Sequence, residues 1–206
     1  MARDTGPQCK QCRREGQKLF LKGERCLTEK CGVERRSYPP GEHGRGRVRA
    51  SEYRNQLREK QKARRFYGVL ERQFSGYYAK ASRQEGVTGD NLLRQLERRL
   101  DNVLVRLGFA ASRRQARQLI NHGHWLVNGK RVDIASYQVR PDDVITIKPG
   151  SGATEVVRQA TELTAVVPPW LQADHDALTA KVLRLPERSE IAAPIQEQLI
   201  VELYSK

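Results

Sequence analysis

Four cysteines have the spacing most typical of a binding site in this 206-residue chain. They are Cys9, Cys12, Cys26 and Cys31, and the sequence contains no other cysteine. Two close pairs separated by a loop are the arrangement in which four thiolates surround one soft cation. We therefore expect a closed, structural metal site with zinc as the default ion. A four-iron, four-sulfur cluster uses the same four ligands, and the spacing does not exclude it.

Two disulfides and unligated thiols are the other interpretations of these cysteines. The amino terminus, MARDTGPQCK, lacks the apolar stretch of a signal peptide. We therefore expect the protein in the cytoplasm, where thiols stay reduced. The lysines and arginines between the cysteines favour thiolates and offset their charge. A segment this polar cannot fold by apolar contacts alone, so metal binding would supply the missing free energy.

The charge balance of the chain points to a polyanionic partner. There are 38 Lys and Arg residues against 24 Asp and Glu, which gives a formal net charge of +14. Nucleic acid is the first candidate partner for such a charge. No apolar run approaches the roughly 18 residues of a spanning helix, so no membrane partner is expected. From Thr154 onward acidic residues outnumber basic ones, and this tail is expected to pack against the first domain or a neighbouring protein.

The segment from Arg35 to Arg65 carries much of the positive charge, with eleven basic and three acidic residues. It begins with a Pro- and Gly-rich loop, SYPPGEHGRGRVRASEY, in which alternate arginines can follow a phosphate backbone. A helix is expected from Ser51 with apolar and aromatic residues along one side through Tyr78. Its tyrosines fit a core position better than base stacking. The opposite side is cationic with few acids nearby in the sequence, which favours an RNA contact over a merely solvated face.

A second unit begins near Leu92. An apolar helical stripe runs to Gly108, and a capping box then starts a helix at Arg113. Arg113, Arg114 and Arg117 are expected together on the side opposite the apolar one. The turn Asn128–Gly129 predicts a hairpin, and residues 144–147 predict a further strand.

These motifs resemble a known family. The SRRQARQLI helix, the VNGKRV hairpin and the VRPDDVI return resemble the alpha-L RNA-binding domain. The same motifs with PGEHG, LREKQKARRFYGVLERQF, DIASYQV and LIVELYSK resemble bacterial small-subunit ribosomal protein S-four over essentially the whole chain. The resemblance implies an α+β fold with a mainly helical first domain, which carries the four-cysteine metal knuckle. An alpha-L domain with a small antiparallel sheet is inserted into it.

The expected domains follow from this resemblance. Residues 1–45 are expected to form the metal knuckle and basic loop. Residues 46–91, completed by 181–206, are expected to form the helical domain. Residues 92–180 are expected to form the alpha-L domain.

The resemblance also implies partners. They are 16S ribosomal RNA at the five-way junction of its 5′ domain, protein S-five, and mRNA at the entry tunnel near Arg47 and Arg49. It implies a ribosome-associated structural protein that contributes to translational accuracy, binds no small-molecule substrate and is not an enzyme. The candidate RNA-binding residues are Arg13, Arg14, Arg35, Arg36, His43, Arg45, Arg47, Arg49, Arg54, Arg58, Lys60, Lys62, Arg64, Arg65, Arg113, Arg114, Arg117, Lys130 and Arg131.

Two other functions compete with this one. An RNA-modifying enzyme that uses the alpha-L domain as an anchor needs a separate catalytic domain, and no contiguous stretch outside residues 92–153 resembles one. No P-loop, GxSxG or HExxH motif is present in the sequence. A zinc-ribbon regulator that binds DNA is the other alternative, suggested by the cysteines and the basic loop.

Overall fold

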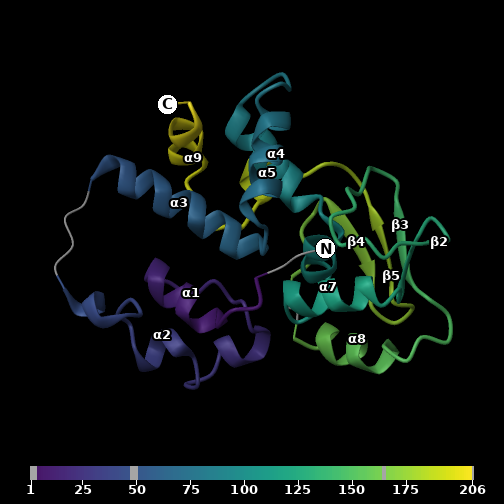
Figure 1. Cartoon of the computed structure of the whole chain (residues 1–206). Helices are drawn as coiled ribbons and strands as arrows, with labels where there is room; N and C mark the ends of the chain where they lie inside the picture. The colour runs from purple at the N-terminus through teal and green to yellow at the C-terminus, as the bar shows by residue number, and fades with distance from the viewer. Residues whose placement is uncertain (1–3, 47–50, 164–165, 206) are drawn as a thin grey trace. The chain divides into compact units, whose positions relative to one another are not determined.

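The structure is a computed structural model that describes residues 4–46, 51–163 and 166–205. The chain divides into two compact units (Figure 1). Unit 1 consists of Met1–Leu92 and Ala193–Lys206, and unit 2 of Leu93–Ala192. The class is α+β, as expected, with helices in unit 1 and helices plus an antiparallel sheet in unit 2.

The carboxy-terminal boundary differs from the expectation. Residues 181–192, expected in the helical domain, belong to unit 2. The reason is strand β5 (Thr179–Val182), which pairs with two other strands of the unit 2 sheet. Residues 1–45 and 46–91, which were expected to be separate, lie in one unit.

Unit 1 is helical in its described residues. Its elements are α1 (Gln8–Glu15), η1 (Gly23–Cys26), α2 (Gly32–Arg35), η2 (Glu42–Arg45), α3 (Glu52–Tyr67), α4 (Glu71–Ala81) and α9 (Glu197–Tyr204). Helix α5 (Thr88–Glu97) begins in unit 1 and ends in unit 2.

The expected long helix after Ser51 is divided in two. The Ser51 hydroxyl accepts a hydrogen bond from the Arg54 amide at 3.3 Å and caps α3. Gly68 then adopts φ of 64° and ends the helix, so α4 starts a new direction. Phe66 and Phe74 are buried on the apolar side, as expected for core residues, whereas Tyr53 is 58% exposed.

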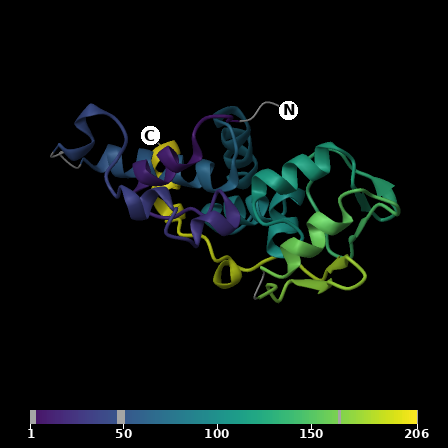
Figure 2. The same cartoon turned by 90° about the horizontal axis from the view of Figure 1, so that it is seen from below.

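The carboxy-terminal helix α9 packs against α3 and completes unit 1 (Figures 1 and 2). Two polar contacts fix it: Gln56 donates to the Glu202 carboxylate at 3.0 Å, and the Gln196 amide donates to Glu59 at 2.7 Å. Tyr204 stacks on Tyr78 with the ring centroids 4.4 Å apart. The end of the acidic tail therefore packs against the first domain as expected, whereas residues 154–192 belong to unit 2, where Val157 and Trp170 are part of the core.

Unit 2 packs helices onto one face of a five-stranded sheet. Its helices are the end of α5, α6 (Leu100–Arg106), α7 (Arg113–Asn121), α8 (Thr154–Thr161) and η3 (Arg188–Glu190). The antiparallel strands are β1 (Trp125–Val127), β2 (Lys130–Arg131), β3 (Val144–Ile147), β4 (Leu171–Asp174) and β5, in the order β2-β1-β3-β5-β4. A buried apolar core joins α6, α7 and α8 to the inner sheet face.

The local sequence signals correctly predict a helix and a turn of unit 2, with one exception. Helix α7 begins at Arg113, and Ser112 accepts from the Gln115 amide at 3.3 Å. The Asn128–Gly129 turn has φ of 51° and 75°, as a two-residue hairpin requires. The exception is the stripe before Gly108, which forms two helices because the chain is extended at Arg99.

Candidate metal centre and nucleic-acid interface

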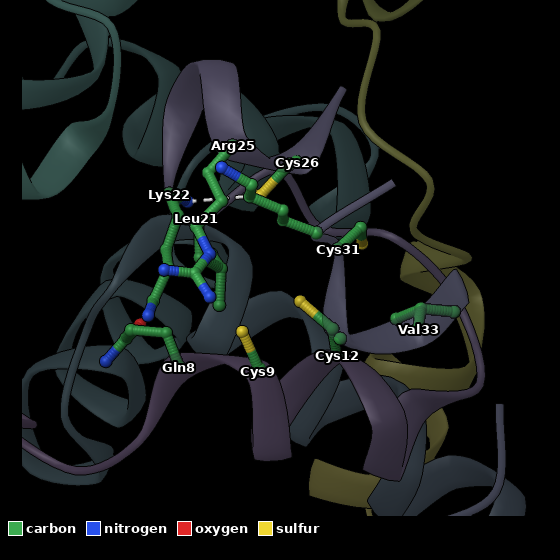
Figure 3. A pocket seen from close by; sticks show the side chains of 11 residues that line it. Gln8, Cys9, Cys12, Leu21, Lys22, Arg25, Cys26, Cys31 and Val33 are labelled. Carbon is green, nitrogen blue, oxygen red and sulfur yellow. Dashed lines mark hydrogen bonds between the residues drawn. The ribbon is translucent and has the colours of Figure 1, made fainter. Parts of the chain in front are cut away.

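All four cysteines border one small pocket that is partly open to solvent. Cys9 and Cys12 lie one turn apart on α1, while Cys26 ends η1 and Cys31 precedes α2. Figure 3 shows the side chains of these two pairs around the pocket. The sequence spacing thus brings the expected four residues together, although three different helical elements supply them.

The surroundings of the sulfur atoms suit thiolate ligands. Cys12, Cys26 and Cys31 are buried, and the Lys22 amide donates to the Cys26 sulfur at 3.4 Å. Burial raises the pKa of the Cys12 thiol, and the other three cysteines raise it further. The Cys12 thiol therefore resists ionisation unless a cation is present to stabilise the thiolate. Gly32 packs so closely on this site that a Cβ there would lie 2.7 Å from the Cys9 Cβ.

The cysteine side chains are not arranged as they would be around a bound metal ion. Among the described residues, no group of three or more Cys, His, Asp or Glu side chains is placed so that it could hold a metal. The donor set and the shared pocket nevertheless fit a soft divalent cation, since four cysteines can close a tetrahedron with Zn–S distances near 2.3 Å. The four-cysteine metal knuckle is therefore not confirmed and stays a prediction.

The cations of α3 are paired, contrary to the sequence-based expectation. Arg58 and Arg65 both form ion pairs with Glu15, whose side chain is 3% exposed. The other partners are Glu71, which accepts from Lys60 at 3.0 Å and from Arg64 at 2.9 Å, and Glu59, which accepts from Lys62 at 2.6 Å. Most of these acids come from other helices, so counting acids within the basic segment underestimated the compensation.

Glu71 is a centre of contacts between α4 and its neighbours. Besides its two cations it accepts a hydrogen bond from the Tyr204 hydroxyl at 2.8 Å. Burial raises the pKa of Glu71, but hydrogen bonds from Tyr204 and Lys60 outweigh burial and bring it below its usual value. The pKa of Tyr204 is raised far above its usual value by burial and by the carboxylate it contacts. The cationic side of α3 therefore also anchors the carboxy-terminal helix.

Arg117 occupies a different place from the one expected. The sequence placed it with Arg113 and Arg114 on the side opposite the apolar face, but it is only 8% exposed. Its Nε donates to Asp101 at 3.1 Å, and the same carboxylate binds Arg99, whose side chain is 0% exposed. Arg117 is therefore part of a buried ion network. Its helical position is adjacent to the apolar side because Ala116 and Ile120 flank it.

Arg113 is held by a second polar network. Its Nε donates to the Asn102 side-chain oxygen at 2.8 Å, and Asn102 donates to Glu97 at 2.6 Å. Arg106 forms a two-bond ion pair with Glu97 at 2.7 Å and 3.0 Å. Arg114 is exposed and lies next to Arg113 on α7. Two of the three arginines thus remain at the surface near the amino terminus of α7.

The remaining candidates are distributed over both units. Arg54 lies in the first turn of α3 and is half-buried. Arg47 and Arg49 lie outside the described residues. The other candidates are exposed or half-buried in the loops and short elements of their units, namely Arg13, Arg14, Arg35, Arg36, His43, Arg45, Lys130 and Arg131.

Sequence reasoning missed several residues of these sites. Glu15 and Asp101 neutralise arginines from other elements, and no pattern of spacing links Glu15 to residues 43 and 50 positions away. Gly32 follows Cys31 directly, which is the one signal that could have marked it. Tyr38 lies in the loop that was expected to carry arginines, and Arg13 and Arg45 both lie over its ring.

No described helix has both the length and the apolar character needed to cross a membrane.

Similarity to known proteins covers the whole chain. Residues 3–97 match the family described as ribosomal protein S4/S9 N-terminal domain, and residues 98–145 match the S4 domain. Small ribosomal subunit protein uS4 of Pelotomaculum thermopropionicum is 58% identical, and that of Citrifermentans bemidjiense is 57% identical, each over 208 residues. The corresponding protein of Thermodesulfovibrio yellowstonii is 56% identical. Each alignment covers 100% of both chains. The chain therefore belongs to the family of small ribosomal subunit proteins uS4.

Proposed function

We propose that this chain is a structural component of the small ribosomal subunit and acts as a primary binder of 16S ribosomal RNA. Its place is then with ribosomes in the cytoplasm, and its role is assembly rather than catalysis. The full-length similarity to proteins named small ribosomal subunit protein uS4 supports this most directly. The expected RNA contact is the five-way junction in the 5′ domain. The protein would bind this junction early in the assembly of the small subunit.

The distribution of cations supports an RNA partner. The chain carries a formal net charge of +14, and ion pairs within the described residues neutralise much of α3. The surface cations that remain are therefore the residues available to phosphates. Arg114 is one example, because it lies in the first turn of α7, where the helix dipole also favours an anion. Recognition would follow the shape and backbone of folded RNA more than its base edges.

Two finer roles rest on the resemblance to the family alone. Arg47 and Arg49 would face incoming mRNA at the entry tunnel, and protein S-five would be a neighbour that shares in translational accuracy. Replacing Arg47 and Arg49 is then expected to spare rRNA binding more than translation through structured mRNA.

The four cysteines would hold a structural zinc ion, with a four-iron, four-sulfur cluster as the alternative. Support comes from the shared pocket, the buried thiols and the adjacent lysines and arginines. When bound, the ion would supply folding free energy to a segment with little apolar core. Cys9 and Cys12 would then hold α1 to the elements that carry Cys26 and Cys31.

The RNA role is tested by binding to a transcript of the 16S 5′ domain across a salt series. The logarithm of the binding constant should fall steeply as the logarithm of the salt concentration rises. The slope is about −0.9 for each phosphate contacted on a duplex. Duplex DNA of matched length serves as the competitor and separates this role from that of a DNA-binding regulator. A flat salt response, or a preference for the DNA, would contradict the proposal.

The metal is tested by elemental analysis and a visible absorption spectrum of anaerobically purified protein. One zinc per chain without visible absorption supports zinc, while iron with visible absorption supports the cluster. The Cys26→Ser variant should lose the metal and loosen residues 1 to about 35. Unit 2 should stay folded, and unchanged metal content would refute the assignment.

A further inference from the structure

Tyr38 organises an arginine cluster in the loop that follows α2. The Arg13 Cζ lies 5.0 Å from the centroid of its ring, and the Arg45 Cζ lies 4.5 Å from the same centroid. Arg13 also donates from Nε to the Tyr38 carbonyl at 3.0 Å, and Arg14 donates to the Pro40 carbonyl at 3.2 Å. The last turn of α1 thus holds the loop backbone, and one tyrosine ring holds two guanidinium groups. We call Arg13, Tyr38 and Arg45 the Tyr38 cluster.

Gly44 explains how Arg45 reaches the ring. A Cβ at residue 44 would lie 2.0 Å from the Pro39 carbonyl oxygen and 3.6 Å from the Tyr38 Cδ2. The backbone of η2 therefore folds back onto residues 38–39 closely enough to exclude any side chain at this position. This close approach brings the next residue, Arg45, over the ring.

The cluster is cationic, and no acid among the described residues forms an ion pair with it. None of the ion pairs between described residues includes Arg13, Arg14, Arg36 or Arg45. Hydrogen bonding from Arg45 lowers the pKa of the Tyr38 hydroxyl, and the charges of Arg45, Arg36 and Arg13 lower it further. A positive potential therefore surrounds the ring. The contrast with α3, where each of five cations has a carboxylate partner, is clear.

We propose that the Tyr38 cluster is a preformed site for the phosphate backbone of RNA, in which Tyr38 is a positioning residue that holds Arg13 and Arg45. A stacked guanidinium keeps its N–H groups directed outward in the plane of the group, which suits a phosphate. Holding two like charges at one ring is unfavourable until an anion arrives, so a polyanion relieves that repulsion. The cluster also reduces the side-chain entropy lost on binding, because the ring restricts both long side chains beforehand. This inference rests on the proposed RNA-binding function and adds the residues that perform it in unit 1.

The test compares variants of the full-length protein, using the 16S 5′-domain transcript across a salt series. Arg45→Gln removes an exposed charge without touching the core, and it should lower the salt slope by about one. Tyr38→Ala should weaken binding several-fold although both arginines remain, whereas Tyr38→Phe retains the ring and should stay within about twofold of wild type. Gly44→Ala should resemble Tyr38→Ala, because it displaces Arg45.

Two controls complete the design. Tyr53→Ala removes an exposed tyrosine of α3 outside the cluster and should leave binding unchanged. Inorganic phosphate and a mononucleotide are added as competitors. Competition by either at concentrations comparable to the RNA would overturn the assignment to an RNA backbone in favour of a small-anion site.

The outcomes separate the two proposals. If wild-type protein shows no salt-dependent RNA binding, the proposed function fails. If wild type binds steeply but Arg45→Gln and Tyr38→Ala keep its affinity and slope, the Tyr38 cluster proposal alone is overturned. A Tyr38→Ala variant as weak as expected, together with a normal Tyr38→Phe variant, supports the positioning role.

Discussion

Replacing Asp101 with asparagine should strongly destabilise unit 2. The Asp101 carboxylate accepts two hydrogen bonds from Arg99, at 3.0 Å and 2.8 Å, and further bonds from Arg117. The exposed fractions of the side chains are 1% for Asp101, 0% for Arg99 and 10% for Arg117. The asparagine variant retains the shape but removes the buried negative charge that both guanidinium groups contact.

The expected cost follows from this geometry. Removing one partner of a buried ion pair typically costs about 3–5 kcal/mol, and the lower end applies because asparagine can still accept a hydrogen bond. A loss of about 3 kcal/mol lowers the melting temperature of a domain of this size by about 12–24 °C. Against a total stability of about 5–15 kcal/mol, that is a large fraction.

The assay uses a property of the sequence. Both tryptophans, Trp125 and Trp170, are buried in unit 2, so the tryptophan fluorescence of the full-length protein reports the unfolding of that unit. Arg114→Gln is the matched control, since it removes an exposed charge from the same domain. By the same scale, a shift of about 3 °C in melting temperature corresponds to a stability change below about 1 kcal/mol. A melting temperature for Asp101→Asn within about 3 °C of wild type would therefore refute the buried network.

Four further predictions concern the other sites. Glu15→Gln should destabilise unit 1 by about 1–3 kcal/mol, because two arginines lose their shared carboxylate; hydrogen exchange of α3 measures this, and unchanged tryptophan melting is the control. Because the pKa of Glu71 is lowered on folding, its contribution to stability is present above the unfolded glutamate value of about 4.3 and is lost as the pH falls below it. Tyr204→Phe should make the acid-induced loss of unit 1 stability between pH 7 and pH 3 shallower, and an equal loss would contradict this. Gly32→Ala should weaken zinc binding at least several-fold in a chelator competition, because a methyl group would collide with the first cysteine of the site. Arg114→Gln should weaken RNA binding without changing tryptophan melting, so an unchanged affinity would remove it from the interface.

Local signals in the sequence predicted much of unit 2. The capping serine before α7 and the Asn128–Gly129 turn determine their elements through neighbouring backbone groups, and both were found where expected. The division of the long helices was missed. At Gly68 a glycine inside a helical pattern is compatible with either a continuous helix or an end, and only the packing of α4 decides.

The candidate sites were predictable to different degrees. The four cysteines could be grouped from spacing alone, and the structure places them around one pocket. The cationic surface could not be read in the same way, because a charge is neutralised by whatever lies nearby in space. Glu15 reaches α3 from α1, and Asp101 reaches Arg117 from a different helix. Helical periodicity gives the face of a residue but not the acid that faces it.

The central claim is that RNA binds the cations that form no ion pair within the described part of the chain rather than those that do. Two double variants, each removing two positive charges, test it: Arg36→Gln with Arg45→Gln, and Lys60→Gln with Lys62→Gln. The slope of RNA affinity against salt should fall by about two for the first pair and stay near the wild-type value for the second. The opposite result, with the lysine pair lowering the slope and the arginine pair leaving it intact, would contradict the account.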